Sequence, residues 1–493
     1  MIPKIPFEFF PAATPIFILS VGGLVAMMQS VYPKIGGHGL VKTVFFASLL
    51  GALVTSFLTP VDMSLAFFEG SFLSEALAKF GSVVLIAISI IIGMFYACTY
   101  QKEHFFRGEI SSLFLLTLIG ALVLVASDEI VSLFVGLEMA SIGLYALAGY
   151  VKVNRLSMEG AIKYFVLGSF ATGFLLFGLG LLVAGTGSMR VSEMIQLATN
   201  LADHPWIKLG SLFVLVGIGF KLALAPFHLW GPDTYEGAST GLTGFMATAV
   251  KTMMIILTLR FFAYGQFTVK ELWMNGLVFL AATSLLLGNI MALVQSSVKR
   301  MLAYSSISHS GYMAIAVVAI NATSSQMPVA AILFYLVGYT LVSLGAFGCL
   351  MWLENQNAEN LQLEDFSGLA KKHPYVCATL SVFLLAFAGF PPTVGFISKF
   401  FVFSAALRSN LHGLVITGVV GSMIAMFYYL RLIVKMYMTE PTNLTGALVA
   451  PKSYFMSALL AGLVVLVILL GTVLPSPFFS VVQQAAESIS VTH

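Results

Sequence analysis

The chain has 493 residues, of which 59% are hydrophobic and only 9% are charged, and its mean hydropathy is +0.98. About a quarter of the residues of a soluble domain are charged, so this composition excludes an ordinary soluble protein. Repeated apolar runs of about 20 residues predict a polytopic membrane protein. The net charge of +3 is small and dispersed, which argues against nucleic-acid binding.

The cysteines do not suggest a metal site. Cys98, Cys349 and Cys377 lie in or beside apolar segments and show no CxxC spacing, so we interpret them as small core side chains. No GxGxxG motif opens a strand–helix unit either. We therefore expect no metal, iron–sulfur cluster, nicotinamide or flavin to be bound by this chain itself.

The hydrophobic pattern predicts an all-α polytopic fold with about 14 membrane spans joined by short connections. No small-residue cleavage pattern follows the first apolar run, which we expect to be retained as a span. The longest polar connection, residues 353–374, could hold a short surface helix. The spans are predicted near residues 12–30, 43–60, 78–98, 110–126, 129–149, 160–185, 209–230, 240–264, 273–294, 302–321, 327–353, 375–407, 412–438 and 454–474.

Lysine and arginine are unevenly distributed between the two sides of the membrane. The odd-numbered loops carry 13 of them and the other side carries 7. The positive-inside rule therefore places the odd loops in the cytoplasm and both termini in the periplasm of a bacterial plasma membrane. The two sets are Lys34, Lys42, Lys102, Arg107, Lys152, Arg155, Lys299, Arg300, Lys371, Lys372, Arg431, Lys435 and Lys452 against Lys4, Lys79, Arg190, Lys208, Arg260, Lys270 and Arg408.

Among the charged residues, one glutamate and four lysines lie within predicted spans and are not assigned to a loop: Glu138, Lys163, Lys221, Lys251 and Lys399. A charged side chain at the bilayer centre costs several kcal/mol or more, and such residues face the bundle interior, a partner or water. Burial favours a neutral lysine and a nearby carboxylate favours a charged one, so a proton on one site biases the next. This pattern predicts a proton relay.

Lys163 differs from the others because it lies only about one turn into its span. Glu159 precedes it by four residues and therefore lies on the same helical face. A static ion pair, or a lysine that extends toward the headgroups, is the alternative to a relay role at this position.

Two histidines could extend the relay. His228 follows Lys221 by seven residues, two helical turns, and is expected on the same face. It could instead bond a loop carbonyl. His309 lies in a span among the hydroxyls of Tyr304, Ser305, Ser306, Ser308 and Ser310, which could line a hydrated path or form a seam of interhelical hydrogen bonds.

Prolines interrupt two of the spans that contain central lysines. Pro226 removes a backbone donor five residues after Lys221, and the sequence GFPP at 389–392 precedes Lys399. Broken helices in corresponding positions are typical of transporters with inverted repeats. We predict three N-terminal spans, two inverted five-helix repeats and a C-terminal helix with a tail. Their ranges are 1–108, 109–265, 272–440 and 450–493.

Lys299 and Arg300 lie in a short connection at the predicted cytoplasmic surface. They could anchor a helix at the headgroups or contact neighbouring subunits.

Long contiguous motifs carry a family resemblance over roughly residues 10–475. The chain resembles the antiporter-like membrane subunits of respiratory complex I, the NADH–quinone oxidoreductase, and among them subunit N. Sister subunits L and M and the Mrp-type antiporters usually carry histidine at the position of Lys251, and subunit M usually carries glutamate at that of Lys399. The motifs are GLEMASIGLYALAGY, EGAIKYFVLGSFATGFLLFG, FKLALAPFHLWGPDTYEGA, GNIMALVQSSVKRMLAYSSISHSGYM and AGFPPTVGFISKF.

The resemblance implies a proton-translocating channel within a larger translocase. It implies that Glu138 pairs with Lys221, that Lys163 and Lys251 continue the central axis, that Lys399 is a terminal site, and that His309 matches the family histidine. FMN, iron–sulfur clusters and quinone would be bound by partner subunits, with subunits M and K as neighbours. The alternatives are a subunit of an Mrp-type cation/proton antiporter without a redox partner, and a purely structural scaffold.

Overall fold

The computed structural model describes most of the chain, and several residues used above to assign orientation fall outside it. Lys4, Lys34, Lys152 and Lys452 lie outside the described residues. The described ranges are 9–32, 37–59, 61, 66–67, 72–99, 101–151, 154–199, 201, 203–263, 270–322, 326–354, 360–441 and 453–488.

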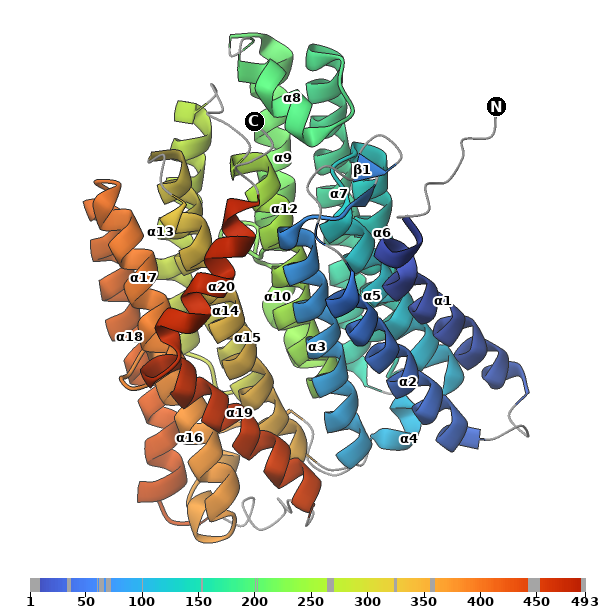
Figure 1. Ribbon diagram of the computed structural model, residues 1–493. Coiled ribbons are helices and arrows are strands. Elements are labelled where there is room, and N and C mark those ends of the chain that lie inside the picture. Colours follow the sequence, from blue (N-terminus) through green and yellow to red (C-terminus); the bar gives the residue numbers. More distant parts are fainter. Residues whose placement is uncertain are drawn as a thin grey trace.

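The protein is a bundle of long helices (Figure 1). Twelve spans within these ranges are long and apolar enough to cross a membrane, which confirms a multi-pass membrane protein. They are α1 (Phe9–Val31), α2 (Gly37–Leu58), α3 (Ala76–Cys98), α5 (Gly108–Ala126), α6 (Ile130–Ala148), α7 (Arg155–Thr186), the run of α11 (Thr240–Phe245), the π-helical turn η2 (Met246–Val250) and α12 (Lys251–Ala263), then α13 (Lys270–Leu293), α14 (Val298–Ala322), α15 (Met327–Leu353), α18 (His412–Met438) and α19 (Tyr454–Thr472).

The two remaining predicted spans are the interrupted ones. The first is α9 (Pro205–Lys221), a non-helical stretch over 222–229, and α10 (Trp230–Gly237). The second is α16 (Pro374–Ala388), a break over 389–393, and α17 (Val394–Arg408). The expected 14 spans are therefore 12 continuous spans and 2 broken ones.

Smaller elements lie at the ends of the bundle. They include a two-stranded ribbon of β1 (Ala66–Phe67) and β2 (Phe72–Leu73), α4 (Lys102–Phe105) and α8 (Val191–Thr199). The long connection after α15 forms two short 3₁₀ turns, η3 (Leu363–Phe366) and η4 (Leu369–Lys371), rather than an α-helix.

The end of the chain contains an element that the sequence pattern did not separate from a tail. The helix α20 (Pro475–Glu487) follows α19 directly. It packs on α15 and α3, while α19 packs on α15, α16 and α17. In Figure 1 both helices run diagonally across the bundle, so together they join the N-terminal helices to the C-terminal ones.

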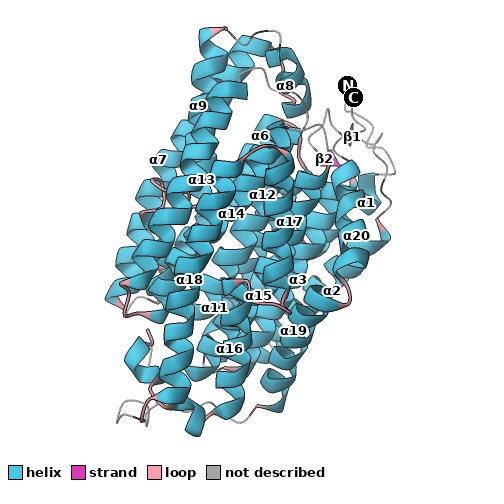
Figure 2. Ribbon diagram, turned by 90° about the vertical axis from the view of Figure 1, so that its left-hand side faces the viewer, coloured by secondary structure: helices cyan, strands magenta, loops and turns pink. Residues whose placement is uncertain are grey.

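The helices α12, α14 and α15 form the centre of the bundle (Figure 2). All or nearly all of their residues within the apolar window are buried. A helix that is apolar on every side is stable only when neighbours surround it. These three helices therefore hold the groups that they carry, Lys251 and His309 among them, away from lipid.

Glycines allow two helix pairs to pack very closely, one in each predicted repeat. A Cβ on Gly120 of α5 would lie 2.5 Å from the amide nitrogen of Ala140 on α6. A Cβ on Gly288 of α13 would lie 2.8 Å from the amide nitrogen of Ser308 on α14. The two inverted repeats and their boundaries stay predictions.

Substitution of Gly136 by alanine should destabilise the protein. Its Cβ would lie 2.7 Å from the amide nitrogen of Leu124 and 2.8 Å from the carbonyl oxygen of Gly120, and backbone atoms cannot rotate away. Overpacking of this kind costs about 1–3 kcal/mol. The midpoint of heat denaturation in detergent should fall. Gly173→Ala is the control because nothing lies within 4 Å of that position; equal midpoints for the two variants would contradict the close packing.

Candidate functional site

At the first helix break, hydroxyl groups of two neighbouring helices form hydrogen bonds with the freed backbone groups. Because α9 ends at Lys221, the carbonyl of Leu222 has no helical partner and accepts a hydrogen bond of 2.6 Å from Ser310 Oγ of α14. The amide of Ala225 donates to Ser284 Oγ of α13 at 2.8 Å. Non-helical backbone is stable at membrane depth only where other groups satisfy it in this way.

Lys221 lies at the end of α9 and points toward α6. Its Nζ donates to Ser141 Oγ at 2.7 Å and to Tyr145 Oη at 3.2 Å. Glu138 lies one turn before Ser141 on α6, and its Oε1 is buried without a hydrogen-bond partner among the described residues. The two side chains form no direct ion pair in the described part of the chain, so Ser141 lies where the resemblance implied a contact.

Lys251 is joined to the first break through one hydroxyl group. Its Nζ donates to Ser310 Oγ at 2.6 Å, and that same oxygen donates to the Leu222 carbonyl next to Lys221. Lys251 follows the π-helical turn η2, a distortion that frequently occurs at functional sites. Its Nζ also lies 5.6 Å from the centre of the Tyr339 ring.

His309 lies on α14 within an aromatic cluster. Its Nδ1 is 2.7 Å from Tyr335 Oη, and its ring centre is 5.0 Å from that of Tyr339 and 5.9 Å from that of Tyr312. Ser306 bonds Tyr339 at 2.8 Å on the same helix face. The hydroxyl stripe of α14 therefore forms interhelical hydrogen bonds, one of the two interpretations that the sequence left open.

Lys399 binds the backbone carbonyls that are freed at the second helix break. It belongs to α17, and its Nζ donates to the carbonyls of Phe387 and Ala388 at 3.0 Å each, at the end of α16. A cation is stabilised at a helix C-terminus because the carbonyls there lack helical partners. The Nζ also lies 4.8 Å above the ring of Tyr312, which contacts His309.

The structure thus brings five predicted residues into one line: Glu138, Lys221, Lys251, His309 and Lys399. From Lys221 to Lys399, successive members are linked by a hydroxyl group, a backbone carbonyl or shared tyrosine rings, and Glu138 lies one turn before the Ser141 that Lys221 contacts. We define this line as the central polar row. It crosses α6, α9, α12, α14 and α17.

Lys163 lies apart from the central polar row. Its side chain is 41% exposed and contacts Glu159 at 2.8 Å and Asp233 at 2.6 Å. The predicted contact with Glu159 is confirmed. Because the charge is paired at the surface of the bundle, the geometry favours the static ion pair that the sequence left as an alternative.

The predicted position of His228 on the same helical face as Lys221 is wrong. The helix ends at Lys221, so the regular turn of about 3.6 residues does not extend to His228. The His228 ring instead lies 6.4 Å from that of Tyr304 on α14, and its Nδ1 is buried without a partner among the described residues.

Two buried ion pairs were not anticipated. Arg260, which we had placed in a loop, is fully buried at the end of α12, and its Nη2 is 2.6 Å from Glu75 Oε1. Lys299, for which the sequence leaves a headgroup anchor or a subunit contact open, is buried within the chain, with Nζ 3.9 Å from Glu354 and 3.0 Å from the Ala238 carbonyl. Each partner is distant in sequence, so no local pattern could have paired them.

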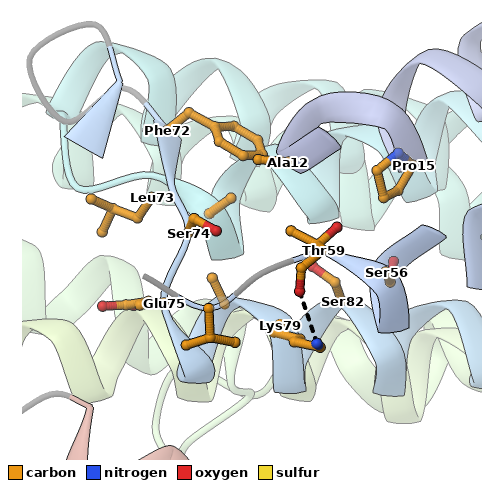
Figure 3. Close-up of a pocket in the computed structure, with 13 residues that line it drawn as sticks. Ala12, Pro15, Ser56, Thr59, Phe72, Leu73, Ser74, Glu75, Lys79 and Ser82 are labelled. Atoms are coloured by element: carbon orange, nitrogen blue, oxygen red, sulfur yellow. Dashed lines mark hydrogen bonds between the residues drawn. The ribbon is translucent and has the colours of Figure 1, made fainter. Parts of the chain in front are cut away.

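A small cavity of about 40 Å³ lies beside Glu75, at the end of the bundle near β2 (Figure 3). Lys79 lines it, and its Nζ donates to the Phe57 and Thr59 carbonyls at 2.8 and 2.9 Å. Ser56 and Ser82 also line this cavity. The Arg260–Glu75 pair therefore lies next to the polar lining of this cavity, at the end of α12.

Comparison with known proteins identifies the family. The family described as NADH:quinone oxidoreductase/Mrp antiporter, TM, matches residues 127–425. NADH-quinone oxidoreductase subunit N of Rhodospirillum rubrum is 34% identical over 97% of each chain. The subunit N 1 protein of Herpetosiphon aurantiacus is 38% identical over 85% of this chain and 86% of its own length.

This chain belongs to the subunit N family of NADH–quinone oxidoreductases. A chain of respiratory complex I from Thermus thermophilus superimposes with a TM-score of 0.79 at 29% identity, over 94% of this chain and 98% of that one. A chain of the Mrp complex from Dietzia sp. shares the fold, with a TM-score of 0.83 at 19% identity over 97% of each chain. The chain is thus a membrane subunit of the complex I type.

Breaking the Arg260–Glu75 pair should cost more stability than breaking an exposed one. Glu75→Gln removes the partner of a buried cation, a change that typically costs about 3–5 kcal/mol. The midpoint of heat denaturation should fall clearly. The control is Asp203→Asn, which removes an exposed partner 2.8 Å from Lys208 and should leave the midpoint nearly unchanged. If the Glu75→Gln variant has the same denaturation midpoint as the control, the Arg260–Glu75 pair contributes nothing to stability.

Proposed function

We propose that this subunit translocates protons along the central polar row while electron transfer from NADH to quinone proceeds in other subunits of the same oxidoreductase. The observation that carries the proposal is the link from Lys251 through Ser310 to the Leu222 carbonyl at the first break. It joins Lys251 to the backbone next to Lys221, so these two lysines of the first predicted repeat meet at one hydroxyl group of α14. A proton on one of them changes the preferred charge of the next.

The two helix breaks supply the row with backbone carbonyls that have no helical hydrogen-bond partner and can act as acceptors. At the first break Lys221 ends α9, and at the second Lys399 binds the last carbonyls of α16. An amine held by neutral hydroxyls and carbonyls has no fixed counter-charge to keep it permanently protonated. Lys221, Lys251 and Lys399 are therefore the proposed carriers, with Glu138 and His309 as the groups that tune them. Lys163 and His228 lie apart from the row and are assigned only a secondary role.

The outer face of α6 supports a subunit contact at Glu138. Val131, Val135 and Ile142 lie on this face, and each side chain is more than half exposed. Their spacing places them with Glu138 along one stripe of the helix. We propose that a neighbouring subunit, M or K, covers the stripe. FMN, the iron–sulfur clusters and quinone are assigned to partner subunits, and both termini to the periplasmic side of a bacterial plasma membrane.

An Mrp-type antiporter subunit without a redox partner is the alternative function. The Dietzia match, at 19% identity, shows the fold alone, and a shared fold does not imply a shared function. The relatives named above are oxidoreductase subunits. Purification distinguishes the two: migration with flavin and iron–sulfur subunits supports the proposal, and a complex free of redox cofactors supports the alternative.

Replacing Lys221 by alanine should reduce NADH-driven proton pumping several-fold in membrane vesicles, because the row loses a carrier at the first break. The measurement is quenching of a pH-sensitive dye, with NADH–ferricyanide activity as a check on assembly. Lys208→Ala is the matched control, since Lys208 begins the same helix and is paired with Asp203 at its exposed end. Normal pumping by an assembled Lys221→Ala complex would rule out the proposed role.

A further inference from the structure

A cavity of about 500 Å³ opens on the side of the bundle between α7, α10 and α14. Its polar lining consists of Lys163, His228, Asp233, Arg300 and Tyr304. This volume lies in the range of ligand sites, about 300–1,000 Å³. The central polar row does not use this space.

The rim of the cavity is apolar and faces outward. Leu229 is 69% exposed, Ile162 is 60% exposed, and Val166 is also exposed. On a membrane span such side chains lie against hydrocarbon. The cavity lies near the ends of α7 and α14 at which these helices begin, at the depth where headgroups meet acyl chains. Its occupant is therefore expected to be an amphiphile with a polar head and an apolar body.

Charges of both signs alternate around the cavity. Lys163 Nζ contacts Glu159 and Asp233 at 2.8 and 2.6 Å, while Arg300 Nη1 contacts Asp233 and Glu236 at 2.6 and 3.0 Å. Three carboxylates accompany two cations, so the cluster has a formal charge of −1. An anionic headgroup would be repelled by the excess carboxylate. A headgroup with one cation and one phosphate would complement both signs.

Unused hydrogen-bonding capacity on the cavity side favours the same headgroup. Lys163 has three N–H donors and uses two on carboxylates. The buried His228 Nδ1 has no partner among the described residues. Arginine and lysine bind phosphate through charge-assisted hydrogen bonds. Glu159 and Glu236 can accept from a primary ammonium, whereas a quaternary ammonium has no N–H to donate.

We propose that this cavity binds the headgroup of a zwitterionic phospholipid with a primary ammonium, of the phosphatidylethanolamine class. The phosphate lies against Arg300 and Lys163. The ammonium lies toward Asp233, the carboxylate of the lining, and toward Glu236 and Glu159, which contact the two lining cations. The acyl chains leave over Leu229 and Ile162.

Site-specific crosslinking in the assembled oxidoreductase tests the proposal. A photoreactive amino acid replaces Leu229, and the complex is reconstituted into liposomes that contain fluorescent phosphatidylethanolamine, phosphatidylcholine or phosphatidylglycerol in turn. Crosslinking to phosphatidylethanolamine should exceed crosslinking to each of the other two several-fold. The Glu236→Gln and Glu159→Gln variants should each lower the ratio of phosphatidylethanolamine to phosphatidylcholine, a ratio that does not depend on the amount of folded protein.

A second crosslinking position provides the control. Met438 is highly exposed at the end of α18 and lies one turn after Lys435, whose Nζ pairs with Glu364 outside the cavity. Crosslinking from this position should not discriminate among the three lipids. Equal yields from Leu229 for all three lipids, or crosslinking from it to another polypeptide of the complex, would overturn the proposal.

Discussion

The cost of placing an amine and unpaired backbone groups inside a membrane is the constraint on which the site depends. Neither is stable alone in hydrocarbon. In this protein the buried amines and the unpaired backbone carbonyls stabilise each other. The carbonyls exposed where α16 ends receive the amine of Lys399, and the carbonyl exposed after α9 is bound by the hydroxyl that also receives Lys251. A broken helix and a buried lysine therefore form one structural unit.

The surrounding helices follow from that unit. The site needs α12, α14 and α15 fully enclosed, and the remaining spans enclose them while α19 and α20 join the two flanks. Close glycine contacts hold α6 to α5 and α14 to α13, which fixes the helices that carry Glu138 and His309. Small residues at helix contacts are the usual means of tight packing in membranes. The closely packed helices are thus also helices that carry members of the central polar row.

The sequence was sufficient to predict the number of spans, the two helix breaks and the lysines in the broken spans. These features depend on segment length, hydropathy and proline, all of which act locally. It failed where a local rule was extended across a break, as for His228, whose position depends on a non-helical turn. It also failed for Arg260 and Lys299, which are near the ends of apolar runs and resemble loop residues. Their burial depends on Glu75 and Glu354, which only the folded chain brings close. Glu138 and Lys221 were paired by resemblance, whereas Ser141 lies at the contact.

The central claim is that Ser310 connects the two halves of the row, and its removal is the most direct test. Ser310→Ala deletes the oxygen that joins Lys251 to the Leu222 carbonyl, whereas Ser308→Ala deletes an oxygen that donates to the Ser305 carbonyl of its own helix and does not contact Lys251 or the Leu222 carbonyl. The measurement is the number of protons pumped per NADH oxidised by each assembled complex in liposomes. The account predicts a lower ratio for Ser310→Ala and a normal ratio for Ser308→Ala. A normal ratio for both variants would contradict it.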